Sequence, residues 1–372
     1  MSDLLSGSEA CARLVSVVSA ETSGGYSTNP LLLKKPYPGA MVVDASLRSS
    51  FALTTDAGSS IEIGGVLTRR EYSRVYPGLT TGDIHFVGLY RDDERLSIRS
   101  AARIERSLLA DVVTSSIDAL AGSQGRRLNY LAEAGLIWQP DAYTRIEPQF
   151  SYEGNRYSRT DLLANTSAAG ARVNISRRVT PYATIGARVG TVRNAIDGQS
   201  NFWTTSFSLN ADQRLAKAWR ATLELGVERA GAQMSFGDPA RAPVRARTIL
   251  AGSVRLCHET SMLTACTAAG LQSEPSGLVG LERRLTISAT ASRQLRPDVT
   301  ISMAGDYLRS SVKGTALPTL HAVTGSFLVE WRPVKALTAG ARVEYRRREL
   351  LQGGAAGAGL IGLRLRYDWR RG

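Results

Sequence analysis

The sequence predicts a single antiparallel β-barrel that spans a membrane, with about 18 strands and with 16 as the nearest alternative. Segments with period-two alternation follow one another along the chain, and no run of ~18 apolar residues could form a transmembrane helix. The clearest segment lies near the C-terminus, where Leu363, Leu365 and Tyr367 alternate with Arg364 and Arg366. Such a strand has one apolar and one charged face. Because no helix-period segment could cover the apolar faces, we expect lipid to cover them.

The predicted strands recur at roughly 20 residues per strand and connection, which suits ~10 membrane-spanning residues plus overhangs and loops. Each was placed where apolar and polar residues alternate between turn-forming residues. In chain order they are 12–21, 40–54, 60–71, 83–91, 95–107, 127–138, 143–154, 165–177, 182–194, 201–213, 218–231, 245–257, 262–273, 281–293, 298–310, 320–332, 335–347 and 358–369.

The predicted connections alternate between tight turns and longer segments. Tight turns are expected at 56–59, 92–94, 139–141, 178–181, 215–217, 258–261, 296–298 and 332–334. Longer segments are expected at 22–39, 72–82, 108–126, 155–164, 195–200, 232–244, 274–280, 311–319 and 348–357. Bacterial barrels pair short periplasmic turns with longer extracellular loops, so both termini are predicted to be periplasmic and the strand number even.

Segment 108–126 lacks the period-two pattern. We expect an ordinary outer loop there. The alternative is a short helix or a pair of strand ends, which would narrow the pore if the segment folded inward.

Aromatic residues gather near the predicted strand ends, as expected for the two girdles of a membrane barrel. They are Trp138, Tyr143, Trp203, Trp219, Trp331, Tyr345, Tyr367 and Trp369. A soluble core would place more of its aromatic residues in mid-strand. The mid-strand positions instead carry aliphatic residues such as Leu223, Leu225 and Val227.

The composition indicates one domain over residues 1–372, with 1–11 as a disordered or periplasmic N-terminal segment. The net charge of +13 is carried mostly by arginine. Nucleic acid is excluded as a partner, because the arginines are spread singly along alternating strands and no aromatic stacking platform accompanies them.

The N-terminus and the cysteines give two further expectations. Met1–Leu5 lacks the basic region and apolar core of a signal peptide. Since an outer-membrane barrel must be exported, we expect a processed or trimmed chain, or a misassigned start. Cys257 and Cys266 flank a predicted turn, and we expect unlinked thiols there, with a cross-strand bridge as the alternative.

The sequence predicts no enzyme, no cofactor and no metal site. Its three histidines, His85, His258 and His321, stand beside no nucleophile pattern, and no Gly-x-Ser-x-Gly motif is present. No paired histidine spacing suggests zinc.

The polar strand faces predict an arginine-rich lumen. Rings of arginine favour anions, so an anion-selective pore is the leading hypothesis. The candidate lumen and selectivity residues are Arg99, Arg103, Arg172, Arg188, Arg220, Arg342, Arg346, Arg364 and Arg366. For the last four, the alternative is a purely structural cluster that Glu344 and Asp368 neutralise. Lipopolysaccharide phosphates are expected to contact the outer-loop cations Lys34, Lys35, Arg156, Arg159, Arg241, Arg245, Arg347 and Arg348.

Two short stretches resemble known families. The terminal strand, with Gly362, Leu365, Tyr367 and Trp369, resembles the C-terminal signal of outer-membrane barrels, although Arg370–Gly372 follow its aromatic residue. This implies recognition by the barrel-assembly machinery. The stretch Ser23–Pro30 resembles the start of the first loop in the putative β-barrel porin (type 2) family.

The second resemblance implies a link to exopolysaccharide export and to a periplasmic export partner. The expected function is therefore passage of anionic solutes, or export of an acidic exopolysaccharide, through the outer membrane of a Gram-negative bacterium. The alternative is a plugged structural or docking barrel that anchors a periplasmic partner or binds lipopolysaccharide.

Overall fold

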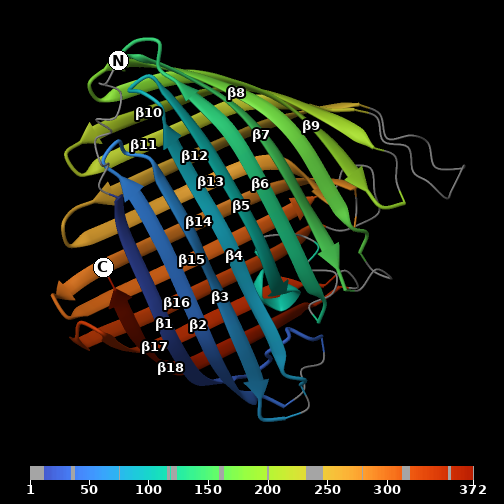
Figure 1. The fold of residues 1–372 in the computed structure, drawn as a ribbon. Helices are drawn as coiled ribbons and strands as arrows, with labels where there is room; N and C mark the ends of the chain where they lie inside the picture. The colour runs from blue at the N-terminus through green and yellow to red at the C-terminus, as the bar shows by residue number, and fades with distance from the viewer. Residues whose placement is uncertain are drawn as a thin grey trace, which may run out of the picture.

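Eighteen antiparallel strands form one closed barrel (Figure 1). The computed structural model describes residues 12–34, 38–74, 76–114, 118, 124–158, 163–198, 201–231, 246–278, 280–311, 319–350 and 353–371. The predicted segment 1–11 lies outside these residues. Each strand pairs with the next, and β1 pairs with β18, so the sheet has no free edge. The predicted fold and the strand number of 18 are confirmed.

The strand bounds follow the predicted segments closely. They are β1 Ala12–Ser27, β2 Ala40–Thr55, β3 Ser60–Tyr72, β4 Leu79–Arg91, β5 Leu96–Leu108, β6 Arg126–Trp138, β7 Thr144–Tyr157, β8 Thr166–Thr180, β9 Ala183–Ile196, β10 Phe202–Ala216, β11 Trp219–Ala230, β12 Arg247–Glu259, β13 Leu263–Ser276, β14 Gly280–Arg296, β15 Val299–Ser311, β16 Leu320–Val334, β17 Leu337–Glu349 and β18 Ala355–Arg371.

The outer wall of the barrel is apolar and exposed. In β18, Ile361 and Leu363 are 64% and 68% exposed, whereas Arg364 and Arg366 on the opposite face are half-buried. The same alternation places Ile84 on the outer face of β4, beside the inward-facing His85. In water this many exposed apolar side chains would be strongly unfavourable, so the outer face is the lipid-facing surface.

Short and long connections lie at opposite ends of the barrel. Figure 1 shows the tight turns and both chain ends on one side, which we call the turn end, and the longer segments on the other, the loop end. Most of the predicted alternation is therefore confirmed. No helix in the described part of the chain is long and apolar enough to cross a membrane.

Several predicted connections, among them 72–82, 178–181 and 332–334, were placed partly within strands, because the strands are longer than expected. β1 continues to Ser27 rather than ending at residue 21, and residues 274–276 belong to β13. In β1 the alternation is hidden by Gly24 and Gly25. A side chain at Gly25 would begin only 2.5 Å from the Ile361 carbonyl oxygen, so the close pairing of β1 with β18 favours glycine there.

The cysteine expectation was also wrong. Cys257 in β12 and Cys266 in β13 lie directly opposite each other, with their Cα atoms 4.1 Å apart, and form a disulfide. Strand register, which the sequence does not specify at single-residue precision, decides this pairing.

Candidate pore constriction

The connection between β5 and β6 folds into the barrel at its loop end. It begins with a 3₁₀ turn, η1, over Leu109–Asp111, which belongs to the coiled segment seen inside the barrel in Figure 1. Leu109, Ala110 and Val113 are fully buried. The expectation of an ordinary outer loop was therefore wrong. Burial of this apolar run inside the mouth explains why it lacks the strand pattern.

The inward segment is anchored to distant parts of the wall. The Asp111 carboxylate accepts hydrogen bonds from Arg70 of β3 at 3.0 Å and from Arg346 of β17 at 2.5 Å. The buried Asp118 accepts hydrogen bonds from Tyr157 of β7 at 2.5 Å and from Ser276 of β13 at 2.6 Å. In an 18-stranded barrel, β13 lies eight strands from β5 and therefore almost opposite it. The described residues of this segment are therefore bonded to β3 and β17 through Asp111 and to β7 and β13 through Asp118.

The β1–β2 connection also turns inward, and the Asn29–Pro30 stretch builds this turn. The Asn29 side chain bonds both the amide nitrogen and the carbonyl oxygen of Leu33, each at 3.0 Å. Leu32 adopts a φ of 52°, which is uncommon for a residue other than glycine, and its side chain is fully buried. Arg348 of β17 donates two hydrogen bonds to the Leu32 carbonyl oxygen, at 3.0 and 3.1 Å.

Together the two inward connections narrow the mouth through apolar packing against the strands. Leu32, Leu109 and Val113 form one buried cluster with wall residues that include Leu308 and Leu320. Leu31 and Ala110 form a second cluster with residues near the β3–β4 connection. These contacts fix the segments in place, since each buried leucine contributes about 1.5–3 kcal/mol relative to exposure.

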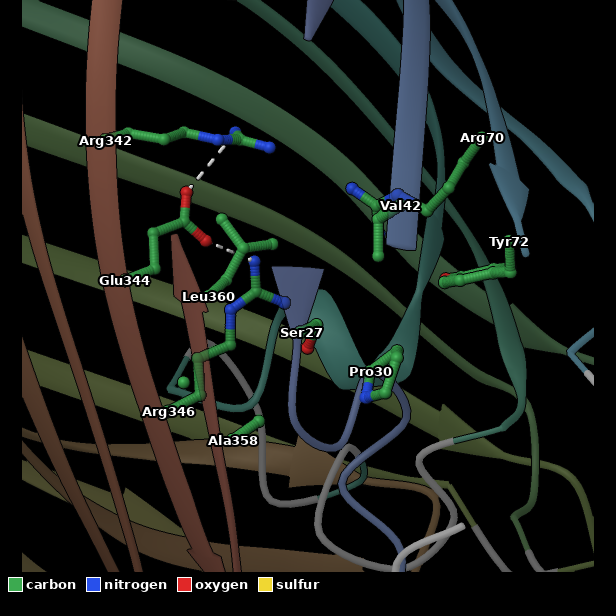
Figure 2. A pocket seen from close by; sticks show the side chains of 11 residues that line it. Ser27, Pro30, Val42, Arg70, Tyr72, Arg342, Glu344, Arg346, Ala358 and Leu360 are labelled. Atoms are coloured by element: carbon green, nitrogen blue, oxygen red, sulfur yellow. Dashed lines mark hydrogen bonds and ion pairs between the residues drawn. The ribbon is translucent and has the colours of Figure 1, made fainter. Parts of the chain in front are cut away.

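A charged pocket lies beside the inward segment (Figure 2). Arg342 and Arg346 project from β17 on one side, and Arg70 and Tyr72 from β3 on the other. Glu344 lies between the two arginines of β17, at 3.3 Å from Arg342 and 2.9 Å from Arg346.

Two further carboxylates, one on β2 and one on the inward segment, pair with the arginines of this pocket. Asp44 of β2 lies 2.8 Å from Arg70 and 3.5 Å from Arg342, and Asp111 joins Arg70 to Arg346. Three guanidinium groups and three carboxylates therefore form one continuous network.

This network controls the ionisation of Asp111. Burial disfavours its charged form, but the adjacent guanidinium groups of Arg70 and Arg346 outweigh burial and lower the pKa of the Asp111 carboxyl below its ordinary value. The inward segment therefore carries a negative charge at neutral pH.

The predicted selectivity residues fall into separate places. Arg342 and Arg346 line the charged pocket, while Arg364 pairs with Glu330 and Arg366 lies 3.0 Å from Asp368. Glu344 and Asp368 thus pair with these arginines, as the alternative of a structural cluster required. That these arginines also set selectivity stays a prediction.

A second group lines the wall farther around the barrel. Arg99, Arg172 and Arg188 border one hollow with Glu133 and Glu147. Arg172 lies 3.6 Å from Glu133, whereas Arg99 forms no ion pair with the described residues. Three other pairs complete the predicted set: Arg103 lies 3.1 Å from Glu105, Arg188 lies 2.9 Å from Glu224, and Arg220 lies 2.9 Å from Asp212.

Sequence reasoning missed Asp44, Arg70 and Asp111. Asp44 and Arg70 stand on the polar faces of alternating strands, so the pattern gave their orientation but not their partners. Asp111 stands in the one long segment that breaks the pattern, and that break was the available signal. Arg348, expected in an outer loop, is buried in the mouth. Lys35, Arg159, Arg241 and Arg245 lie outside the described residues.

No protein-family model matches the chain, and no curated protein matches its sequence. Membership of the type 2 porin family therefore stays a prediction. Solved structures that are similar over nearly the whole chain include OccK9 (OpdG) of Pseudomonas aeruginosa, with a TM-score of 0.49, 9% identity, and 96% of this chain and 98% of that chain covered. OccAB3 of Acinetobacter baumannii has a TM-score of 0.48, 9% identity, and coverage of 96% and 99%.

The closed barrel and its apolar outer wall decide the location on physical grounds, because closed barrels of this kind span outer membranes. The chain is an outer-membrane β-barrel of a Gram-negative bacterium.

Proposed function

We propose that the protein is a pore for small solutes with a preference for anions. The observation that carries the proposal is the inward segment, which is anchored inside the mouth beside Arg70, Arg342 and Arg346. A barrel of this strand number encloses a lumen wide enough for water. A segment that narrows such a lumen next to fixed charges selects solutes by size and by charge.

Unused hydrogen-bond donors favour a solute that carries acceptors. Tyr72 and Arg342 line the charged pocket, and the Tyr72 hydroxyl group and the Arg342 Nε atom are buried there without a hydrogen-bond partner among the described residues. Figure 2 shows the Tyr72 ring directed from β3 towards the β17 side of the pocket. Carboxylate or phosphate oxygens would satisfy such donors, whereas a cation would not.

Export of an acidic exopolysaccharide is a narrower version of the proposal. A polymer would require the inward segment to leave its anchors on β3, β13 and β17. The geometry therefore favours small solutes.

The second candidate is a plugged barrel that serves as a docking or structural protein. The two apolar clusters inside the mouth favour it, because they bury loop residues much as a core does. It predicts that purified protein carries no current.

Single-channel recording in planar bilayers separates these functions. We expect discrete conductance steps and, under a salt gradient, a reversal potential with the sign of anion preference. Absence of conductance would favour the plugged barrel, and cation preference would contradict the role of the arginines.

Charge reversal tests the residues that we assign to selectivity. Arg364→Glu together with Arg366→Glu places new carboxylates beside Glu330 and Asp368 and should shift the reversal potential towards cations. Arg69→Glu on the outer face is the matched control and should leave it unchanged. An unchanged ratio in the double variant would leave Arg364 and Arg366 with a structural role only.

A further inference from the structure

Arginines also stand on the outside of the barrel, near its loop end. In β17, Tyr345 and Arg347 share the outer face and are exposed, while Arg346 between them points into the lumen. The same alternation places one outward arginine near the loop end of half of the strands. They are Arg69, Arg106, Arg126, Arg156, Arg193, Arg229, Arg283, Arg309 and Arg347.

These outward arginines are far from balanced by acids. Among the described residues, the acids on the same face near this end are Glu71, which pairs with Arg69, and Glu349. Near the turn end, the outward arginines of the described strands whose side chains can be placed are Arg177 and Arg293. The outer surface is therefore strongly positive at one membrane interface and much less so at the other.

The densest group stands on three adjacent strands. Register places Arg106 of β5 opposite Leu128 of β6, and Leu128 opposite Arg156 of β7. Neighbouring strands are ~4.8 Å apart, so the Cα atoms of Arg106 and Arg156 are about 10 Å apart. Arg126 lies two residues from Leu128 on the same face, about 7 Å along β6. We call these three arginines the Arg106 cluster.

The Arg106 cluster is open to a ligand. All three side chains are exposed, and none forms an ion pair with the described residues. The rings of Tyr130 and Tyr152 lie next to it on the membrane side, 5.7 Å apart. Gly154 makes room for Tyr130, because a Cβ atom there would lie 2.3 Å from the Tyr130 hydroxyl oxygen. Cations above aromatic rings are typical of a membrane interface.

We propose that the Arg106 cluster binds a phosphorylated glycolipid of the outer leaflet, lipid A. Long loops of bacterial barrels face outward, which puts the cluster at that leaflet. One guanidinium group can donate two parallel hydrogen bonds to the oxygens of a phosphate group. The three guanidinium groups are spread over about 7–10 Å, so they match a headgroup with two phosphates better than a single ion. Leu128 and the two tyrosines offer an apolar surface to the acyl chains.

Binding of purified lipid A to the full-length barrel in detergent, measured by native mass spectrometry, tests the proposal. Each arginine should contribute roughly 5-fold, so Arg106→Gln, Arg126→Gln and Arg156→Gln together should weaken binding on the order of 100-fold. Arg177→Gln with Arg293→Gln at the turn end is the matched control and should bind like the wild type. Unchanged affinity in the triple variant would overturn the proposal.

Ligand variation on the wild-type protein gives an independent test that no folding defect can affect. Lipid A without its phosphates should bind as weakly as intact lipid A binds the triple variant. Equal binding of phosphorylated and dephosphorylated lipid A would refute a phosphate site. Phosphatidylglycerol that binds as tightly as lipid A would show a general attraction to anionic lipid. Competition by inorganic phosphate at millimolar concentration would show a free-anion site. Either result would overturn the glycolipid assignment.

Discussion

Removal of the charge on Asp111 should loosen the inward segment. Asp111→Asn keeps the shape but leaves Arg70 and Arg346, both largely buried, without their shared carboxylate. Loss of one partner from a buried pair costs about 3–5 kcal/mol, and this change falls near the lower end because Asp44 still pairs with Arg70 and Glu344 with Arg346. About 3 kcal/mol corresponds to a shift on the order of 100-fold in the equilibrium between the docked and the released segment.

Single-channel recordings should show this shift as a state of larger conductance whose occupancy rises by that factor. Glu71→Gln is a matched control, because Glu71 also pairs with an arginine near the loop end but on the exposed outer face. An exposed pair contributes about 0–1 kcal/mol, so the control should behave like the wild type. Equal occupancy in the Asp111 variant and the wild type would show that the segment does not limit the current.

Three further outcomes follow from the same contacts. Because the pKa of Asp111 is lowered, its ion pairs hold at all pH values above the ordinary value of 3.8 and are lost only as the pH falls through the lowered value. The larger conductance state should therefore appear only in strong acid. In Asp111→Asn its occupancy should not depend on pH. Ile84→Arg on the lipid face should destabilise the barrel by about 2–4 kcal/mol in urea titrations, whereas His85→Arg on the lumen face should cost less; equal costs would contradict the assignment of faces. Cys257→Ser should cost at most roughly 3 kcal/mol, since the bridge to Cys266 closes a short loop already fixed by the hairpin, and a change in conductance would contradict a purely local role.

Local patterns were enough to predict the barrel. Period-two alternation, as in Leu363 to Tyr367, reports which face a side chain occupies, and this is a property of a few neighbouring residues. The number of strands followed from counting such segments. The predicted strand boundary was wrong where glycine interrupts the alternation, as at Gly24 and Gly25, because glycine has no side chain that would indicate a face of the strand.

The constriction depends on contacts that local patterns do not encode. Asp111 meets Arg346 across 235 residues of sequence, and Asp118 meets Ser276 across 158. The break in alternation after Leu108 showed only that this segment was not a strand. Whether it lies outside or inside the mouth depends on the apolar partners that the closed barrel provides, and those exist only once distant strands have been brought together.

The placement of charge explains why net charge is a poor guide to selectivity in this protein. Most predicted lumen arginines have a carboxylate within 4 Å, such as Glu224 beside Arg188, so much of the lumen charge cancels locally. Several arginines without acidic neighbours, such as Arg106 and Arg156, face lipid instead, although Arg99 in the lumen is also unpaired among the described residues. The net charge of +13 therefore sums two surfaces that meet different partners. The anion preference that we propose would therefore depend on the lumen groups that stay unpaired, which are Arg99 on the wall and the unused donors beside the constriction, and not on the number of arginines along the whole lumen.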